Sequence, residues 1–408
     1  MTDHRSFLPQ VQQIVCGLLA HELFGEKLIL KDDIEWQEVY EECKKQAVII
    51  PAFLSHQQLP LDGEMRQCIQ NAVNNCVYQC IQNETWHGYL DCLMKENNIP
   101  YVVLKGAASA YYYSKSEMRQ SGDVDFLLHK KDSERASAVL EKEGFQAWEE
   151  NHICHIVFRK GQIHYEMHFE PAGVPNGKAG EIIRKYLQDI QITAEEIQNE
   201  TFSCQIPDLF HHGLILLLHM QHHLLSEGIG LRHLCDWAVF FASCSETEFK
   251  NTFQERLERA GVWQFAKIIS LTAHMAVGAP YRSWMGEDYA LAAGLLMDIL
   301  SGGNFGSKDH QRMYEGIFIS NRGKDGVRHS RIVQFIFTLN QVVYTHWPKA
   351  KRWKVLLPPG WLFFGIRQII RMATGKRRKI DFMESYQNSS KRKELYQQLR
   401  LFEIKGKK

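Results

Sequence analysis

Residues 119–128 read Arg-Gln-Ser-Gly-Asp-Val-Asp-Phe-Leu-Leu, in which polar and apolar residues alternate over residues 123–126 as in a β-strand. Side chains alternate between the two faces of a β-strand, so Asp123 and Asp125 are predicted to share one face while the apolar residues around them point into a core. Two neighbouring carboxylates repel each other, and a divalent cation such as Mg²⁺, bridged to substrate phosphates, relieves the repulsion. The stretch therefore indicates a metal-dependent site or, as the alternative, an Asp-rich strand end without a ligand.

A third carboxylate follows in a hairpin predicted over residues 152–171, with its turn at Lys160-Gly161. In its second strand, apolar residues alternate with a polar face on which Glu166 is central. If this strand lies beside the one that carries Asp125, three carboxylates converge, as two-metal phosphoryl transfer requires. The alternative is a polar sheet edge that faces solvent.

Upstream, residues 102–106 read Val-Val-Leu-Lys-Gly, where a strand is predicted to end and a helix to begin. The backbone N–H groups of residues 106–108 are expected to face an anion at the N-terminus of this helix. Lys105 or Ser109 would add a charge or a hydroxyl group to this phosphate cradle. A simple tight turn accounts for the same residues equally well.

Together these segments resemble the DNA polymerase β-like nucleotidyltransferase superfamily, and in particular its bacterial branch of uncharacterised nucleotidyltransferases. The resemblance covers about residues 65–240. The superfamily usually has Gly-Ser or Gly-Gly at the start of the first helix, where this chain has Gly106-Ala107. The matching residues are Asn97-Asn-Ile-Pro-Tyr-Val-Val-Leu104-Lys105-Gly106, Arg119-x-x-Gly122-Asp123-x-Asp125, Glu166-Met167-His168 and Gly230-Leu-Arg232-His233-Leu-Cys-Asp236-Trp.

The resemblance implies an α+β fold with a small mixed-sheet nucleotidyltransferase core. It also implies Mg²⁺-dependent transfer of a nucleoside monophosphate from an NTP to an unknown acceptor, with release of pyrophosphate and with Mn²⁺ as an alternative cofactor. The implied catalytic residues and metal ligands are Asp123, Asp125 and Glu166. The candidate nucleotide-binding residues are Lys105, Gly106, Ser109, Arg119 and Gly122, and the candidate substrate contacts are His168, His219, His223, Arg232 and Asp236.

The rest of the 408-residue chain is predicted to be mainly helical, because apolar residues recur there at helical spacing. We expect an N-terminal helical preface packed on the core (1–97), the nucleotidyltransferase core (98–172), a C-terminal α-helical domain (173–320) and a basic, aromatic-rich segment (321–408). The helical domain is rich in histidine, and His219 and His223 are four residues apart, as zinc ligands can be. The H-E-x-x-H order is missing, so histidines that line a cleft or fill a polar core are favoured over a zinc site.

Charge is segregated along the chain. Residues 321–408 hold 21 Lys and Arg against 5 Asp and Glu, a net charge of +16, which leaves −15 on the first 320 residues since the whole chain carries +1. Within this segment, residues 347–380 interleave aromatic with basic side chains, a composition that suits a peripheral contact with an anionic membrane. Single-stranded nucleic acid is a less favoured partner. A core helix with a solvated basic face is the remaining alternative.

The ten cysteines contain no C-x-x-C pair, which argues against a zinc ribbon or a thioredoxin-type site and favours a reducing compartment. The N-terminus lacks the pattern of a signal peptide, and the apolar stretch 355–370 is too short to span a bilayer. We therefore expect a cytoplasmic protein, with a peripheral position at the inner membrane face. Two alternatives to the enzyme stay open: a non-catalytic nucleotide-binding module and a membrane-surface scaffold.

Overall fold

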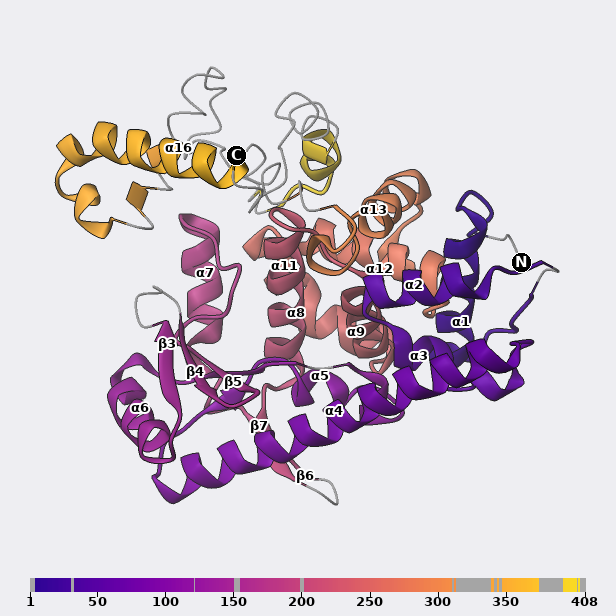
Figure 1. Cartoon of the computed structure of the whole chain (residues 1–408), viewed down its shortest axis with the longest axis horizontal. Coiled ribbons are helices and arrows are strands. Elements are labelled where there is room, and N and C mark those ends of the chain that lie inside the picture. The colour runs from indigo at the N-terminus through magenta and orange to yellow at the C-terminus, as the bar shows by residue number, and fades with distance from the viewer. Residues whose placement is uncertain are drawn as a thin grey trace.

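The computed structural model describes residues 4–309 apart from 31–32, 121, 150–154 and 199–201, together with 312, 339–340, 343–344, 347–373, 392–401 and 403. A mixed β-sheet lies with helices before and after it in the chain (Figure 1), which confirms the predicted α+β class. The helices are α1 (Gln10–Phe24), α2 (Trp36–Gln46), α3 (Ile49–Phe53), α4 (Gly63–Glu96), α5 (Ala107–Ala110), α6 (Ser133–Lys142), α7 (Lys178–Tyr186), α8 (Leu209–Leu224), α9 (Leu231–Ala242), α10 (Glu246–Phe249), α11 (Glu255–Ala260), α12 (Trp263–Val277), α13 (Tyr289–Gly302) and α16 (Leu357–Ala373). The strands are β1 (Val102–Val103), β2 (Val124–Leu127), β3 (Gln146–Glu149), β4 (His155–Lys160), β5 (Ile163–His168), β6 (Glu195–Gln198) and β7 (Ser203–Ile206).

The main sheet has the order β1-β2-β5-β4-β3. Strands β2 and β5 are parallel, and the other neighbours are antiparallel. The predicted hairpin is present as β4 and β5: Lys160 pairs with Ile163, so Gly161 and Gln162 form the turn. Gly161 has a φ of +61°, which a two-residue hairpin turn requires of its first central residue. Residues 152–154 of the predicted hairpin lie outside the described residues.

Three short strands were not predicted from the sequence. Strand β3 pairs with β4 at the sheet edge, and β6 and β7 form a separate antiparallel pair within the region predicted as helical. Cys204 and Ile206 of β7 are buried in the same core as the main sheet. Each of these strands is four residues long, which gives too few alternating positions for a period of two to stand out.

Helix α4 links the sheet to the helical part of the molecule (Figure 1). It has 34 residues and is capped at its N-terminus by Asp62, whose side chain accepts a hydrogen bond from the backbone N–H of Met65. Early in the helix, Ile69 and Val73 belong to the large helical core, whereas Leu90 near its end belongs to the core under the sheet. One helix therefore contributes to both cores.

The large helical core joins segments from the two ends of the sequence. Apolar side chains of α1, α2 and α3 are buried together with those of α8, α9, α12 and α13. Helix α1 lies against α12, and α12 lies against α9 and α13. The N-terminal helices thus pack on the later helices, and α4 is the element that carries the chain from them to the sheet.

The C-terminal segment is described in part. Helix α16 begins with Pro358 and Pro359 in its first turn, where proline is tolerated, and Figure 1 shows it apart from the helical body. Residues 392–398 are helical, and Tyr396 and Leu399 are buried in the large helical core. The basic run 376–379 lies outside the described residues. Among those described, we find no helix with both the length and the apolar character to cross a membrane.

Candidate active site

The parallel pairing of β2 with β5 brings the predicted acidic residues together. Asp125 lies directly opposite Glu166, and His168 follows two positions later on the same face of β5. The opposite face carries Phe126 and Met167, both fully buried in the core. The alternation read from the sequence thus separates an apolar face from a face of ionisable side chains.

Asp125, Glu166 and His168 form a compact group in which one potential ligand atom from each lies within 4.8 Å of the others. The Nε2 atom of His168 is 3.0 Å from Oδ1 of Asp125 and 3.4 Å from Oε2 of Glu166. The ammonium of Lys105 is 2.9 Å from the same Asp125 oxygen. Two carboxylates and an imidazole are a donor set that a divalent cation accepts, so these residues fit a metal ion.

The local charges explain how these groups titrate. Burial would raise the pKa of Asp125, but Lys105 and His168 outweigh burial and hold the pKa well below its usual range. Burial would lower the pKa of His168, but its hydrogen bonds to Asp125 and Glu166 outweigh burial and raise the pKa. Asp125 is therefore a carboxylate at neutral pH, and Lys105 and His168 supply the positive partners that a cation would otherwise provide.

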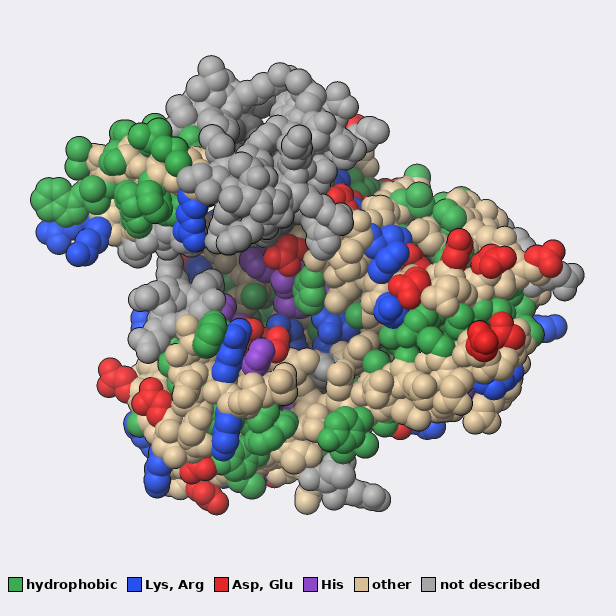
Figure 2. Space-filling model, viewed as in Figure 1, with side chains coloured by type: hydrophobic (Ala, Val, Ile, Leu, Met, Phe, Trp, Pro, Cys, Tyr) green, Lys and Arg blue, Asp and Glu red, His purple; other side chains and the backbone are tan. Residues whose placement is uncertain are grey.

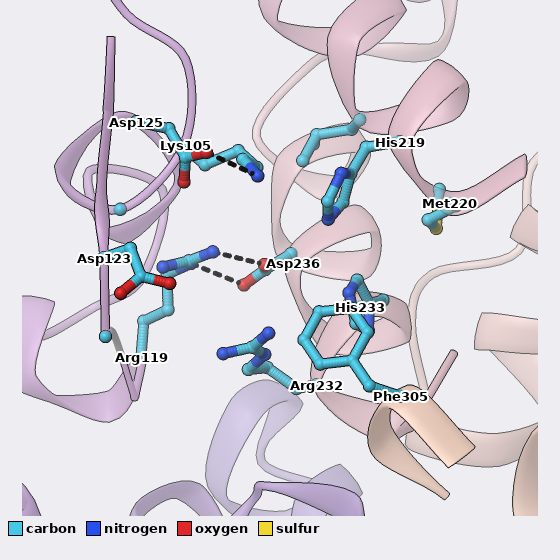
Figure 3. Close-up of a pocket in the computed structure, with 13 residues that line it drawn as sticks. Lys105, Arg119, Asp123, Asp125, His219, Met220, Arg232, His233, Asp236 and Phe305 are labelled. Carbon is cyan, nitrogen blue, oxygen red and sulfur yellow. Dashed lines mark hydrogen bonds and ion pairs between the residues drawn. The ribbon is translucent and has the colours of Figure 1, made fainter. Parts of the chain in front are cut away.

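Asp123 has a different environment from Asp125. It immediately precedes β2, its side chain is 50% exposed, and one of its oxygens lies 3.3 Å from Nδ1 of His164. It is not part of the three-residue group, although it lines the pocket beside it (Figure 3). Burial and the nearby carboxylates of Glu166 and Asp125 raise the pKa of Asp123. A cation at the group would relieve this repulsion.

The segment after β1 differs from the phosphate cradle that we expected. The N–H of Ala107 donates to Nε2 of His87 at 3.4 Å, and the N–H of Ala108 donates to the carbonyl of Lys105 at 3.2 Å. Both groups thus have acceptors within the protein, so the cradle of three backbone N–H groups is not formed. Helix α5 is a single turn, and Ser109 within it is buried and does not line the pocket.

Gly106 is required by the geometry at this turn. Its φ is +63°, and a Cβ atom there would lie 2.8 Å from Nε2 of His87. His87 projects from α4, accepts the Ala107 N–H, and has its pKa lowered to about 4 by burial. Sequence reasoning missed His87, because its contact with the loop joins residues that are 20 positions apart.

Two residues predicted to contact ligands contact each other. The guanidinium of Arg119 makes two hydrogen bonds of 3.0 Å to the two carboxylate oxygens of Asp236 on α9. The hydroxyl of Tyr113 donates to the same carboxylate at 2.8 Å, and all three side chains are buried. This ion pair joins the segment before β2 to the helical part of the molecule.

A pocket of about 130 Å³ separates the sheet side from helices α8 and α9. Figure 2 shows a hollow at its place, in which acidic, basic and histidine side chains meet. His219 and His233 lie across the pocket from Asp123 and Asp125 in Figure 3, and both have a pKa well below the usual value because they are buried. The residues that line it are Lys105, Gly106, Arg119, Gly122, Asp123, Asp125, Leu216, His219, Met220, Arg232, His233, Asp236 and Phe305.

On the helical side, the predicted residue His223 lies outside the pocket lining, and the lining residues Leu216, Met220, His233 and Phe305 were not among the predicted contacts. The ring of His223 makes a T-shaped contact with that of His219, with 4.4 Å between the ring centroids, but His223 does not line the pocket. Phe305 follows α13 and places its ring 5.1 Å from that of His233. The sequence Gly303-Asn-Phe-Gly306 marks a turn, but nothing local indicates that this turn reaches the pocket.

The comparisons with known proteins agree with the geometry. The model of a protein family described as "Uncharacterised nucleotidyltransferase" matches residues 32–278. This range contains the whole sheet and every lining residue of the pocket except Phe305. No curated protein and no solved structure matches the chain.

Proposed function

The chain belongs to the uncharacterised nucleotidyltransferase family, since the family match spans more than half of it, and from this premise we propose that it moves a nucleoside monophosphate from an NTP to an acceptor. The bond that forms joins an acceptor oxygen to the α-phosphorus, and the bond that breaks releases pyrophosphate. The observation that carries the proposal is the register of β2 and β5, which sets Asp125 opposite Glu166 with His168 alongside.

We propose that Asp125, Glu166 and His168 hold the divalent cation, with Asp123 as a further carboxylate at the rim. The cation would polarise the phosphate oxygens and stabilise the negative charge that develops during transfer. Mg²⁺ is the expected ion, and an imidazole in the donor set also suits Mn²⁺. His168 enters the proposal as a ligand, whereas the sequence indicated a substrate contact.

The surrounding side chains would bind and orient the substrates. Lys105 lines the pocket beside Asp125, so its ammonium lies close enough to the cation site to bind a phosphate oxygen. Glu166 is partly exposed and, besides binding the cation, is a candidate to accept the proton of an acceptor hydroxyl group. Arg119 would act indirectly, because its pairing with Asp236 fixes the loop that leads into Asp123.

Metal-dependent nucleotide binding tests the proposal. An NTP should raise the melting temperature in the presence of Mg²⁺ or Mn²⁺ but not in EDTA, because the carboxylates and the triphosphate repel each other without a cation. Asp125→Asn should abolish this shift and the release of pyrophosphate. Glu181→Gln, an exposed acidic residue on α7, is the matched control and should change neither.

The outcomes separate the two other readings of the chain. Equal stabilisation by NTP with and without the cation would support a non-catalytic nucleotide-binding module. The absence of any nucleotide binding would refute the transferase and leave the membrane-surface scaffold.

We also propose that α16 makes a peripheral contact with an anionic membrane. One side of the helix packs on a small cluster through Leu357, Trp361 and Phe364. Leu362, Phe363 and Ile366 are exposed, as are the nearby basic residues Lys349, Arg352, Lys354 and Arg367. Exposed apolar and basic side chains on one element are the combination that binds anionic bilayers.

A further inference from the structure

The charges around the pocket are not balanced on the helical side. Lys105 is paired with Asp125, and Arg119 is paired with Asp236. Arg232 on α9 also lines the pocket, and among the described residues it has no carboxylate within ion-pair distance. Its guanidinium donates a long hydrogen bond of 3.4 Å to the carbonyl of Gln120, and its Nε atom is buried without a partner.

An unpaired guanidinium in this position is costly for the free protein. A guanidinium that is largely removed from water without an anionic partner destabilises the free protein, and burial together with Arg119 lowers the pKa of Arg232. The ring of Phe305 lies 5.4 Å from the guanidinium, a cation–π distance that compensates part of this cost. The guanidinium lies among the side chains that line the pocket (Figure 3).

Neutral imidazoles flank this guanidinium. Both ring nitrogens of His233 and the Nδ1 atom of His219 are buried without a hydrogen-bond partner in the described part of the chain. A neutral imidazole offers one N–H donor and one acceptor nitrogen. These rings can therefore donate to an anion and accept from a hydroxyl group of the same ligand.

The backbone at Phe305 is strained. Phe305 has a φ of +51°, a left-handed conformation that is rare for a non-glycine residue and that is concentrated at functional sites. With this backbone conformation, the Phe305 ring lies 5.1 Å from the His233 ring and 5.4 Å from the Arg232 guanidinium. The helical wall is thus a preformed polar surface closed by one aromatic ring.

We infer that this wall binds an oxyanion of the acceptor, a phosphate or a carboxylate, through Arg232, with His233 and His219 as additional hydrogen-bonding groups. The inference rests on the proposed function for the identity of the ligand as the acceptor. An NTP held through the cation at Asp125 and Glu166 occupies the sheet side, and in-line transfer requires the attacking group to approach from the side opposite the leaving pyrophosphate. The helical wall lies across the pocket from Asp123 and Asp125, so a group bound there shares the pocket with the cation site.

Titration with inorganic phosphate in EDTA tests the anion site without the cation. Phosphate should bind the full chain, and Arg232→Gln should weaken the binding at least tenfold. Arg232→Lys keeps the positive charge but loses the planar set of guanidinium N–H donors, so this variant should bind phosphate with intermediate affinity. Arg282→Gln is the matched control, because Arg282 is also half-buried and donates to a carbonyl, but lies outside the pocket. Wild-type affinity in both Arg232 variants would overturn the inference.

A second titration distinguishes the acceptor from the nucleotide as the source of the anion. The protein is first saturated with a non-hydrolysable NTP analogue and Mg²⁺, and phosphate is then added. Phosphate should still bind to the loaded protein with affinity equal to or higher than before. If the analogue displaces phosphate, the wall binds the triphosphate and the acceptor assignment is wrong. If the protein binds phosphate in EDTA but never binds NTP, the anion site is supported and the proposed transferase function is refuted. A failure of the proposed function can therefore be told from a failure of the anion site.

Discussion

Asp123 and Asp125 are two residues apart and should respond differently to the same substitution. The lowered pKa of Asp125 means that its charge stabilises the fold above the unfolded pKa of about 3.9, and this stabilisation is lost as the pH falls through the folded pKa. The raised pKa of Asp123 means that its charge opposes folding at neutral pH. In EDTA at pH 7, Asp125→Asn should lower the free energy of unfolding by about 2 kcal/mol because Lys105 and His168 lose their acceptor, and Asp123→Asn should leave it equal or higher.

Urea denaturation of both variants with EDTA present measures this difference. A loss of stability in Asp123→Asn as large as in Asp125→Asn would contradict the environments described here. The same pair of variants also reports on the cation, since Mg²⁺ should stabilise the wild type more than Asp125→Asn.

Gly106 allows a separate test of the turn at α5. Gly106→Ala should destabilise the fold by about 1 to 3 kcal/mol, because the new Cβ meets His87 and the φ of +63° is strained for alanine. Gly122→Ala is the matched control, because an added Cβ there has no atom within 4 Å and the φ is not left-handed. In a double-mutant cycle, His87→Ala should recover the steric part of the loss but not the backbone part. Strictly additive losses would show that His87 does not restrict the turn.

At the residue scale, the sequence predicted what depends on local alternation. The shared face of Asp125 and Glu166 follows from the period of two in each strand, together with a strand pairing that the family resemblance supported. The hydrogen bond from Ala107 to His87 and the ion pair of Arg119 with Asp236 join distant segments, so no local pattern contains them. Of the three N–H groups expected to face a phosphate, that of Ala107 has the distant His87 as its acceptor and that of Ala108 has the neighbouring Lys105 carbonyl.

At the scale of single elements, the N-terminus of α8 combines a cap with an ion pair. The carboxylate of Asp208 accepts the backbone N–H of His211 at 2.9 Å and lies 2.9 Å from the Nδ1 atom of the same residue. Burial would raise the pKa of Asp208, but the hydrogen bonds to His211 outweigh it and lower the pKa to about 2. The pKa of His211 is raised, since the hydrogen bond to Asp208 outweighs burial.

Two substitutions of Asp208 separate these contributions. Asp208→Ala removes cap and charge and should lower the free energy of unfolding by about 1 kcal/mol or more, whereas Asp208→Asn keeps a good cap and removes only the charge. The ion pair contributes fully above the unfolded Asp pKa of about 3.9 and below the unfolded His pKa of about 6.5, and its contribution is lost as the pH rises through the raised pKa of His211. The stability difference between wild type and Asp208→Asn should therefore be larger at pH 5.5 than at pH 9, as thermal unfolding at the two pH values will show. A difference that grows with pH would exclude the ion pair.

For the whole molecule, substitutions on the surface of α16 and the residues just before it test the proposed membrane contact. Wild type should sediment with anionic vesicles and less with neutral ones, and binding should weaken in high salt as the surface potential is screened. Two triple variants should each abolish sedimentation, because apolar or electrostatic contacts alone bind a bilayer weakly. One replaces Leu362, Phe363 and Ile366 by serine, and the other replaces Lys349, Arg352 and Lys354 by glutamine.

The control for this experiment is Ile192→Ser, which removes an exposed apolar side chain elsewhere on the surface and should have no effect. Binding that ignores lipid charge and salt would argue against the proposed contact. If the protein instead bound single-stranded RNA in a salt-dependent way and did not bind vesicles, the result would favour a nucleic acid as the partner.

At this scale the sequence predicted the α+β class but not how the helices share their cores. Helical periodicity shows which residues of α1 and α12 are buried, yet not that these faces meet, because they are separated by about 250 residues. The four residues of β6 and of β7 carry too little alternation to compete with the helical pattern around them.

The length of α4 affects how the protein unfolds. A helix of 34 residues is about 51 Å long. Its two ends are buried in different cores, so unfolding of either core exposes apolar side chains of the same helix. The two cores should then melt together, as one calorimetric transition whose measured enthalpy equals the van't Hoff enthalpy. Two resolved transitions would show that α4 behaves as a hinge. If α4 behaves as a single rigid rod, a strain that arises in the helical half would instead be transmitted along it to the turn at Gly106 beside the pocket, through the contact of His87 with that turn.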